Sequence, residues 1–152
     1  DLYSFGRNNY GELGINNKNS NSLNIPTLIG NIPEIQRIEC GYDHSMCIDI
    51  NNHLWLFGYN EYGQLGLGDK ENRYKPIQHP TLSNIIDISS GGDHTFVKTI
   101  ENKIYAFGVN DTLQLGIDTS KEDQLTPIQV LEGKEDIWCS TIGKSKQKSA
   151  RK

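Results

Sequence analysis

The feature that most constrains this chain is a segment that occurs three times at nearly equal spacing. It reads LYSFGRNNYGELGI from Leu2, LWLFGYNEYGQLGL from Leu54 and IYAFGVNDTLQLGI from Ile104, at offsets of 52 and then 50 residues. A proline follows each copy at similar spacing. A fixed period of this length is typical of solenoids and propellers, in which each unit stacks on a neighbour to bury its apolar face.

A second motif keeps the same register. IQRIECGYDHS begins at Ile35 and IIDISSGGDHT begins at Ile85, and both contain Gly-x-Asp-His. Glycine recurs where a backbone needs positive φ or passes close to a neighbour, so we interpret the recurring positions as structural. They are Phe5, Gly6, Gly11, Leu13, Gly14, Gly41, His44, Phe57, Gly58, Gly63, Leu65, Gly66, Gly91, His94, Phe107, Gly108, Leu115 and Gly116.

The polarity pattern predicts strands throughout. The first unit contains four candidates, namely Leu2–Gly6, Thr27–Gly30, Ile35–Cys40 and Ser45–Ile50. Short polar turns at 51–53 and 101–103 lead directly into the next unit, as in a β-hairpin. No segment keeps a helical period over three turns. We therefore predict an all-β chain, a partial β-propeller of three four-stranded blades, with one blade for each unit.

The units run over about 2–53, 54–103 and 104–143, and residues 144–152 form a basic tail that we expect to be disordered. The combined motifs resemble the regulator of chromosome condensation (RCC1-like) repeat, most clearly over residues 54–95, with Phe-Gly in place of the familiar Trp-Gly. The resemblance implies a propeller, usually of seven blades, that binds other proteins. The founding member of that family is an exchange factor for the small GTPase Ran.

The third unit departs from this pattern. Leu113 stands where Gly11 and Gly63 stand in the other units, and Ser140 and Gly143 replace the glycine and histidine of the second motif. Because a propeller closes with about four blades or more, three units leave two sheet faces open. We expect either further blades before Asp1 or a partner on the open faces.

Composition limits the partners. Residues 1–143 carry ten basic and nineteen acidic side chains, whereas the last nine residues carry five basic side chains and no acid. The body is a poor match for nucleic acid, which only the tail could contact weakly. No apolar stretch is long enough to span a membrane, and no export signal is visible. The three cysteines form no CxxC pair, so we expect an intracellular location, cytoplasmic or nuclear.

No constellation of residues points to catalysis. His44 and His94 occupy the same position in the first and second units, so we expect each to hydrogen-bond a neighbouring backbone group and not to bind a metal. Gly143-Lys144-Ser145 lacks the earlier glycine and the following helix of a phosphate-binding loop. We therefore predict that the chain is not an enzyme and has no catalytic residue, cofactor or metal.

Tyr10, Tyr42 and Tyr62 lie in predicted loops, where aromatic side chains often anchor protein interfaces. They are candidates for a recognition surface, and the alternative is that they fill gaps between blades. The first functional hypothesis is a protein-interaction module, including a regulator such as an exchange factor for a small GTPase. The second is a non-catalytic structural fragment or decayed copy of a larger propeller protein.

Overall fold

The computed structural model describes residues 1–19, 22–117 and 121–131. Within these residues no helix is long and apolar enough to cross a membrane. The predicted end of the third unit beyond residue 131 and the predicted tail, 144–152, lie outside the described residues. The strands are β1 (Tyr3–Arg7), β2 (Ser22–Leu28), β3 (Ile35–Cys40), β4 (His44–Asp49), β5 (Leu54–Gly58), β6 (Arg73–Gln78), β7 (Ile85–Ser90), β8 (His94–Thr99), β9 (Ile104–Gly108) and β10 (Gln124–Leu131).

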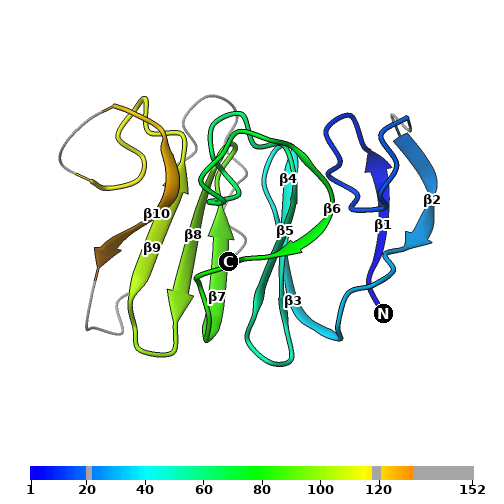
Figure 1. Ribbon diagram of the computed structural model, residues 1–152, viewed down its shortest axis with the longest axis horizontal. Coiled ribbons are helices and arrows are strands. Elements are labelled where there is room, and N and C mark those ends of the chain that lie inside the picture. The colour runs from blue at the N-terminus through cyan, green and yellow to red at the C-terminus, as the bar shows by residue number, and fades with distance from the viewer. Residues whose placement is uncertain (20–21, 118–120, 132–152) are drawn as a thin grey trace, which may run out of the picture.

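These strands form three antiparallel sheets that stand side by side (Figure 1). The first sheet pairs β1 with β2, the second has the order β3-β4-β5-β6, and the third has the order β7-β8-β9-β10. Successive strands are neighbours throughout, which is the meander of a propeller blade. The prediction of an all-β partial propeller is confirmed, although the first sheet has two strands in the described chain and not four.

The assignment of one blade to each sequence unit is wrong. Each four-stranded sheet takes its first two strands from one unit and its last two strands from the next unit. The physical reason is the tight turn between β4 and β5, where Asn52 has positive φ and its amide donates to the carbonyl of Asp49. A turn this short makes the two strands neighbours in one sheet, so the sequence period and the blade differ by half a unit.

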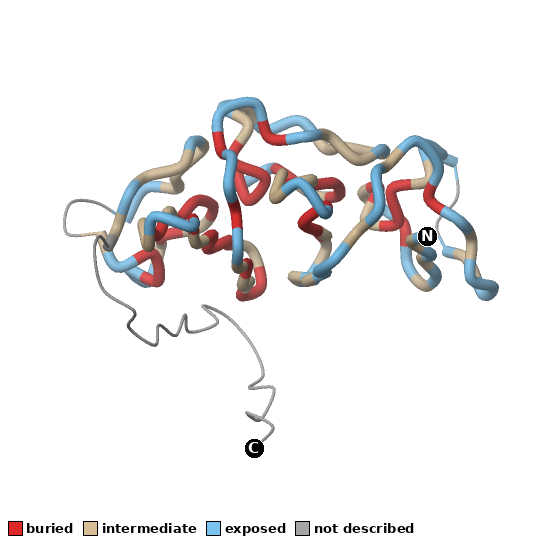
Figure 2. Tube along the Cα trace, turned by 90° about the horizontal axis from the view of Figure 1, so that it is seen from below, coloured by how far each residue is buried: buried red, intermediate tan, exposed pale blue. Residues whose placement is uncertain are grey.

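The core lies between the sheets. Alternate residues of β4 point to opposite sides, so that Met46 and Ile48 pack towards the third sheet while Cys47 packs towards the first. On the other side of the same interface, Ile88 and Phe107 are buried in the third sheet. Figure 2 shows buried segments distributed along the whole row of sheets instead of gathered in one centre. Each sheet therefore depends on its neighbours for burial of its apolar faces.

Candidate functional site

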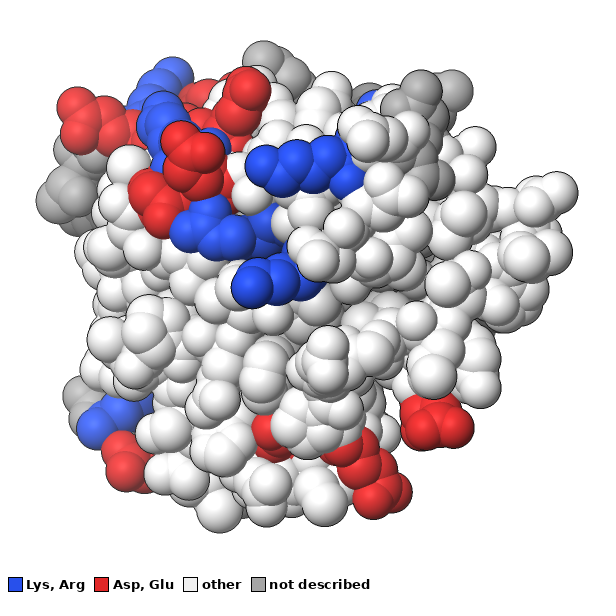
Figure 3. All heavy atoms as spheres, turned by 45° about the vertical axis from the view of Figure 1, so that its right-hand side comes forward, with Lys and Arg blue, Asp and Glu red and all other residues white. Residues whose placement is uncertain are grey.

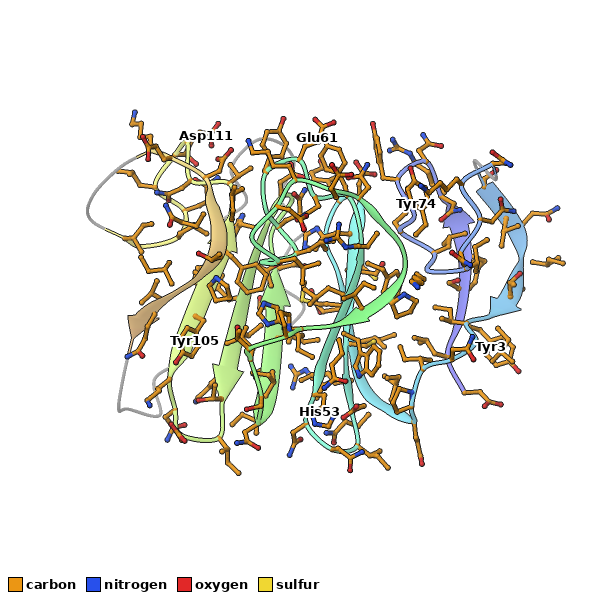
Figure 4. All side chains as sticks on the ribbon, in the orientation of Figure 1. Tyr3, His53, Glu61, Tyr74, Tyr105 and Asp111 are labelled. Atoms are coloured by element: carbon orange, nitrogen blue, oxygen red, sulfur yellow. The ribbon has the colours of Figure 1, made fainter. Side chains whose placement is uncertain are left out.

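The sheets have two different ends. Figure 4 places Glu61 and Asp111 at one end and His53 at the other. We call the first the loop end, because it carries the loops that follow β1, β5 and β9 and the turns that follow β3 and β7. The second, the turn end, carries the tight turns between β4 and β5 and between β8 and β9. The recurring glycines and the candidate tyrosines belong to the loop end.

The loops that follow β1 and β5 each dock on the next sheet. In the loop after β5, a Cβ at Gly63 would lie 2.7 Å from the Cα of Leu125, and a Cβ at Gly66 would lie 2.9 Å from the ring of Phe107. Gly11 and Gly14 make the same approaches to the second sheet. Leu65 is fully buried beside them. These glycines let two backbones and an aromatic ring approach more closely than any side chain would allow.

The glycines of the second and third Phe-Gly pairs, Gly58 and Gly108, are required for a different reason. A Cβ at Gly58 would lie 2.5 Å from the carbonyl oxygen of Asp43, which accepts a 2.8 Å hydrogen bond from the Tyr59 amide. Gly108 and the carbonyl of Asp93 repeat this arrangement in the third sheet. Because φ is also positive at Gly58, a substituted residue would be both strained and crowded.

His44 joins two sheets through a chain of hydrogen bonds. Its Nε2 lies 3.1 Å from the hydroxyl of Thr95 on β8, and that hydroxyl donates to the carbonyl of Gln64 at 2.8 Å. The hydroxyl proton is used on Gln64, so His44 Nε2 is the donor to Thr95. The ring fits because Gly41 has no Cβ, which would lie 2.1 Å from His44 Cε1. The prediction of a backbone partner for this histidine is wrong, since its partner is a side-chain hydroxyl of the next sheet.

Burial fixes the protonation of both histidines. It lowers the pKa of His44 to about 3, with a smaller contribution from the nearby His94, and it lowers the pKa of His94 to about 4. Both rings are fully buried, and His94 Nε2 has no hydrogen-bond partner in the part of the chain that is described. Neutral, enclosed imidazoles are not accessible to a substrate, and that of His44 serves as a structural link between two sheets.

Three tyrosines form a row across the loop end. The ring centroids of Tyr10 and Tyr59 are 4.5 Å apart, and those of Tyr59 and Tyr62 are 5.9 Å apart. The guanidinium of Arg7 lies 5.5 Å from the centre of the Tyr10 ring. We call Arg7, Tyr10, Tyr59 and Tyr62 the tyrosine row. It is continuous across the loops of two sheets and presents rigid aromatic area to solvent.

Carboxylates lie beside the tyrosine row. Arg7 Nη1 is 3.0 Å from Asp43, and Asp93 accepts a hydrogen bond from the Gln64 amide at 3.2 Å. Burial raises the pKa of Asp43 and of Asp93 above the ordinary value, and the repulsion from Asp43 adds to the shift of Asp93. Part of the negative charge of the body is therefore concentrated at the loop end.

The row continues into a cleft of about 540 Å³ that is lined by Tyr62, Asp93 and Asp111 among others. Lysine side chains, Lys70 and Lys121, also line it, so the cleft carries both signs of charge. Figure 3 shows charged side chains of both signs gathered at the upper left of the molecule, at the loop end, with a second and mostly acidic group along the lower edge. We define the loop face as the tyrosine row together with Asp43, Asp93 and Asp111.

Comparison with protein families gives a clear result. The regulator of chromosome condensation (RCC1) repeat matches residues 1–48 and 51–97, and a second profile of the same repeat matches residues 35–64. The chain belongs to the RCC1 repeat family. The predicted resemblance is therefore confirmed. The docking of the glycines and the hydrogen bond of His44 are the contacts that the repeated positions make in this chain.

Curated relatives contain this RCC1 repeat within much longer chains. The chain is 33% identical over 84 residues to the ultraviolet-B receptor UVR8 of Arabidopsis thaliana, covering 55% of this chain and 19% of the receptor. It is 38% identical over 74 residues to the human X-linked retinitis pigmentosa GTPase regulator, covering 47% of this chain and 7% of the regulator. The chain thus spans less than one fifth of either relative.

Solved structures agree on the fold. The crystal structure of Prp20p from Saccharomyces cerevisiae, described with its binding properties to Gsp1p and histones, superposes with a TM-score of 0.76 at 18% identity. The superposition covers 86% of this chain and 34% of Prp20p. At this identity the likeness supports the propeller architecture of the RCC1 repeats alone.

The structure brings two of the three candidate interface residues together. Tyr10 and Tyr62 share the tyrosine row, whereas Tyr42 is exposed on the turn after β3, where its amide donates to the carbonyl of Gly92. Their role in an interface stays a prediction. Sequence reasoning missed Tyr59 and Arg7, which follow the Phe-Gly pair in their units. The variable position directly after a recurring motif is the signal that could have identified them. No group of three metal-ligating side chains comes together within the described residues.

Proposed function

We propose that this chain is a non-catalytic protein-interaction module of RCC1 repeats and that the loop face is its docking surface. The observation that carries the proposal is the continuous tyrosine row beside Asp93 and Asp111, built by loops that the glycine contacts hold on neighbouring sheets. Rigid aromatic side chains next to charged groups are the composition of interaction hot spots. An intracellular location belongs to the same proposal and is supported by the free thiols of Cys40 and Cys47.

The chemistry of the loop face favours a basic partner. Residues 1–143 have an excess of acidic side chains, and Asp43, Asp93 and Asp111 lie where a partner would dock. Aromatic rings add cation–π contacts to arginine or lysine, so the tyrosine row and the carboxylates recognise the same groups. The similarity to a protein studied for histone binding supports the choice of a basic protein as the first partner to examine.

The test is binding of purified core histones to the 152-residue chain, measured by calorimetry at two salt concentrations. We expect saturable binding that weakens with salt. A Tyr62→Ala, Asp111→Asn variant should bind about tenfold more weakly, because it removes an aromatic ring and a carboxylate of the loop face. An Ile50→Ala, Ile100→Ala variant, altered at the exposed tight turns of the turn end, is the control and should bind like the parent. Equal loss in both variants, or no binding by the parent, would contradict the proposal.

A second candidate, regulation of a small GTPase, is favoured by similarity to a GTPase regulator and to Prp20p. Its test is release of a fluorescent guanine nucleotide from a panel of purified small GTPases. Acceleration by the chain that is lost in the loop-face variant supports exchange activity. If the chain accelerates nucleotide release from no GTPase of the panel, the exchange activity is contradicted and the binding function is left.

A further inference from the structure

The chain holds one of its own arginine side chains at the loop end, between an aromatic ring and two carboxylates. Arg7 Nη1 lies 3.0 Å from a carboxylate oxygen of Asp43, and the guanidinium carbon lies 5.5 Å from the centre of the Tyr10 ring. Glu12 lies 3.8 Å from Arg7 Nε and accepts a 2.7 Å hydrogen bond from the Tyr10 amide. This arrangement suits arginine, because a flat guanidinium can lie over a ring while it bonds an acid.

The next pair of sheets repeats the arrangement one unit later. In the register of the repeat, Tyr62 and Asp93 take the places of the ring and the carboxylate that hold Arg7. The side chain of Gln64 joins them, because it accepts a 3.1 Å hydrogen bond from the Tyr62 amide and donates one of 3.2 Å to Asp93. The ring and the carboxylate are therefore held together although they belong to neighbouring sheets.

The second arrangement lacks the arginine. Tyr59 occupies the position of Arg7, and its hydroxyl donates to Glu61 at 2.9 Å. Within the described residues Asp93 forms no ion pair, and its side-chain partner is the neutral amide of Gln64. Asp93 thus lies where the first arrangement binds a cation, and no cation of the described chain is bound to it.

The cleft beside Asp93 has room for an arginine side chain from another molecule. Its volume is about 540 Å³, and Val109 and Leu125 supply apolar surface for the methylene groups of such a side chain. Lys70 and Lys121 also line the cleft, but neither forms an ion pair with Asp93 in the part of the chain that the structure describes.

The charges around Asp93 favour a bound cation. Burial raises the pKa of its carboxyl, and repulsion from Asp43 and Asp111 adds to that shift. An arginine offsets both effects, because its charge is permanent and its N–H groups can bond a carboxylate through two parallel hydrogen bonds. A lysine ammonium carries the same charge but lacks the flat surface that stacks on an aromatic ring such as Tyr62.

We propose that Tyr62 and Asp93 form a subsite for an arginine side chain of a partner protein, bound as Arg7 is bound within the chain. The inference rests on the proposed function and deepens it, because the subsite is part of the loop face. It adds that the basic partner is recognised through arginine in preference to lysine.

The test is an NMR titration of the isotope-labelled 152-residue chain with acetyl-arginine amide, and acetyl-lysine amide is the matched probe. We expect the arginine probe to shift the amide resonances of Tyr62, Asp93 and Val109 saturably, and the lysine probe to shift them less at equal concentration. Asp93→Asn, which keeps an oxygen that can accept from Gln64, should abolish the saturable shifts. Unchanged resonances away from the loop end show that each variant is folded.

A second pair of variants tests the comparison with Arg7. Tyr59→Arg places an arginine of the chain itself where Arg7 stands in the first arrangement, so this side chain should occupy Asp93 and prevent binding of the probe. Tyr59→Gln is the matched control, because it removes the same ring without supplying a guanidinium. It should bind the arginine probe as the parent does.

Three results would overturn the proposal: no saturable shifts or equal shifts from the two probes, shifts that persist in Asp93→Asn, and equal loss in Tyr59→Arg and Tyr59→Gln. These outcomes are separate from the histone experiment. A chain that binds core histones but not the arginine probe keeps the docking function and loses the subsite. A chain that binds the probe but no histone keeps the subsite and loses the proposed docking function.

Discussion

At the scale of single residues, the buried histidines show how a repeat uses one side chain for one contact. His44 reaches Thr95 across the interface, and the empty space over Gly41 makes room for its ring. A proton on His44 would have no acceptor at Nδ1, which is buried and has no partner in the described chain. The neutral form is therefore the one that the fold stabilises.

We predict that stability falls as the solution is acidified below pH 6.5. His44 and His94 have folded pKa values of about 3 and 4, below the ordinary 6.5, so the unfolded chain takes up protons first. Their stabilising effect is complete above pH 6.5 and is lost as the pH falls towards the folded values. The loss is about 2 kcal/mol for each histidine between pH 7 and pH 5. Urea unfolding at both pH values measures it. His44→Gln should remove about 2 kcal/mol of the pH dependence, and an unchanged dependence would contradict the account.

At the scale of elements, the loops after β1 and β5 are as much a part of the interface as the strands are. Each loop lays its glycines on the strand backbone and the phenylalanine of the following sheet. The strand faces change along the row as well. Lys98 stands on β8 where Ile48 stands on β4, so the far face of the third sheet is less apolar than the face of the second.

We predict that Gly63→Ala destabilises the chain more than Gly68→Ala does. Both glycines have positive φ, at 77° and 82°, so the strain of a Cβ is shared. Only Gly63 would also place that Cβ against strand backbone, whereas at Gly68 the nearest atom is the Thr126 methyl carbon at 3.6 Å. We expect a loss of about 1 kcal/mol at Gly68 and about 3 kcal/mol at Gly63. Chemical denaturation measures both, and equal losses would show that the docking of the loop is not tight.

At the scale of the whole molecule, stability is distributed along a row and depends on the number of neighbours. The second and third sheets share a continuous core that includes Ile48, Ile88 and Phe107. The first sheet has two strands in the described chain and leaves Tyr3 and Phe5 exposed. A two-stranded sheet with one exposed face is marginal by itself and relies on the sheet beside it.

We predict that backbone amides of β1 exchange with solvent much faster than those of β5 and β9. The three strands occupy equivalent places in the repeat, but β1 pairs only with β2 in the described residues whereas β5 and β9 pair on both edges. Local opening of the first sheet exposes little new apolar surface and is therefore easy. Hydrogen exchange followed by mass spectrometry measures the difference. Equal protection of β1 and β9 would indicate that the first sheet is as firmly held as the others.

The strands themselves follow closely from the sequence. Ile35–Cys40 coincides with β3, and the predicted strands at Leu2 and Ser45 differ from β1 and β4 by one residue at each end. The predicted bounds Thr27–Gly30 are wrong, because β2 runs over Ser22–Leu28 and pairs along β1 through residues on both sides of Pro26. Alternating polarity and short polar turns report backbone conformation locally, so such elements need no tertiary information. The recurring glycines were identifiable for the same reason, because their spacing is itself a sequence property.

The sequence by itself determined that the chain is all-β, that it repeats, and that it belongs among RCC1 repeats. Tertiary structure alone decided that each sheet combines halves of two units, that His44 bonds a hydroxyl 51 residues away, and that Tyr59 completes the tyrosine row. Periodicity records what each segment does with its own backbone. Which distant segment lies against it depends on close packing between surfaces, and that appears only when the sheets are brought together.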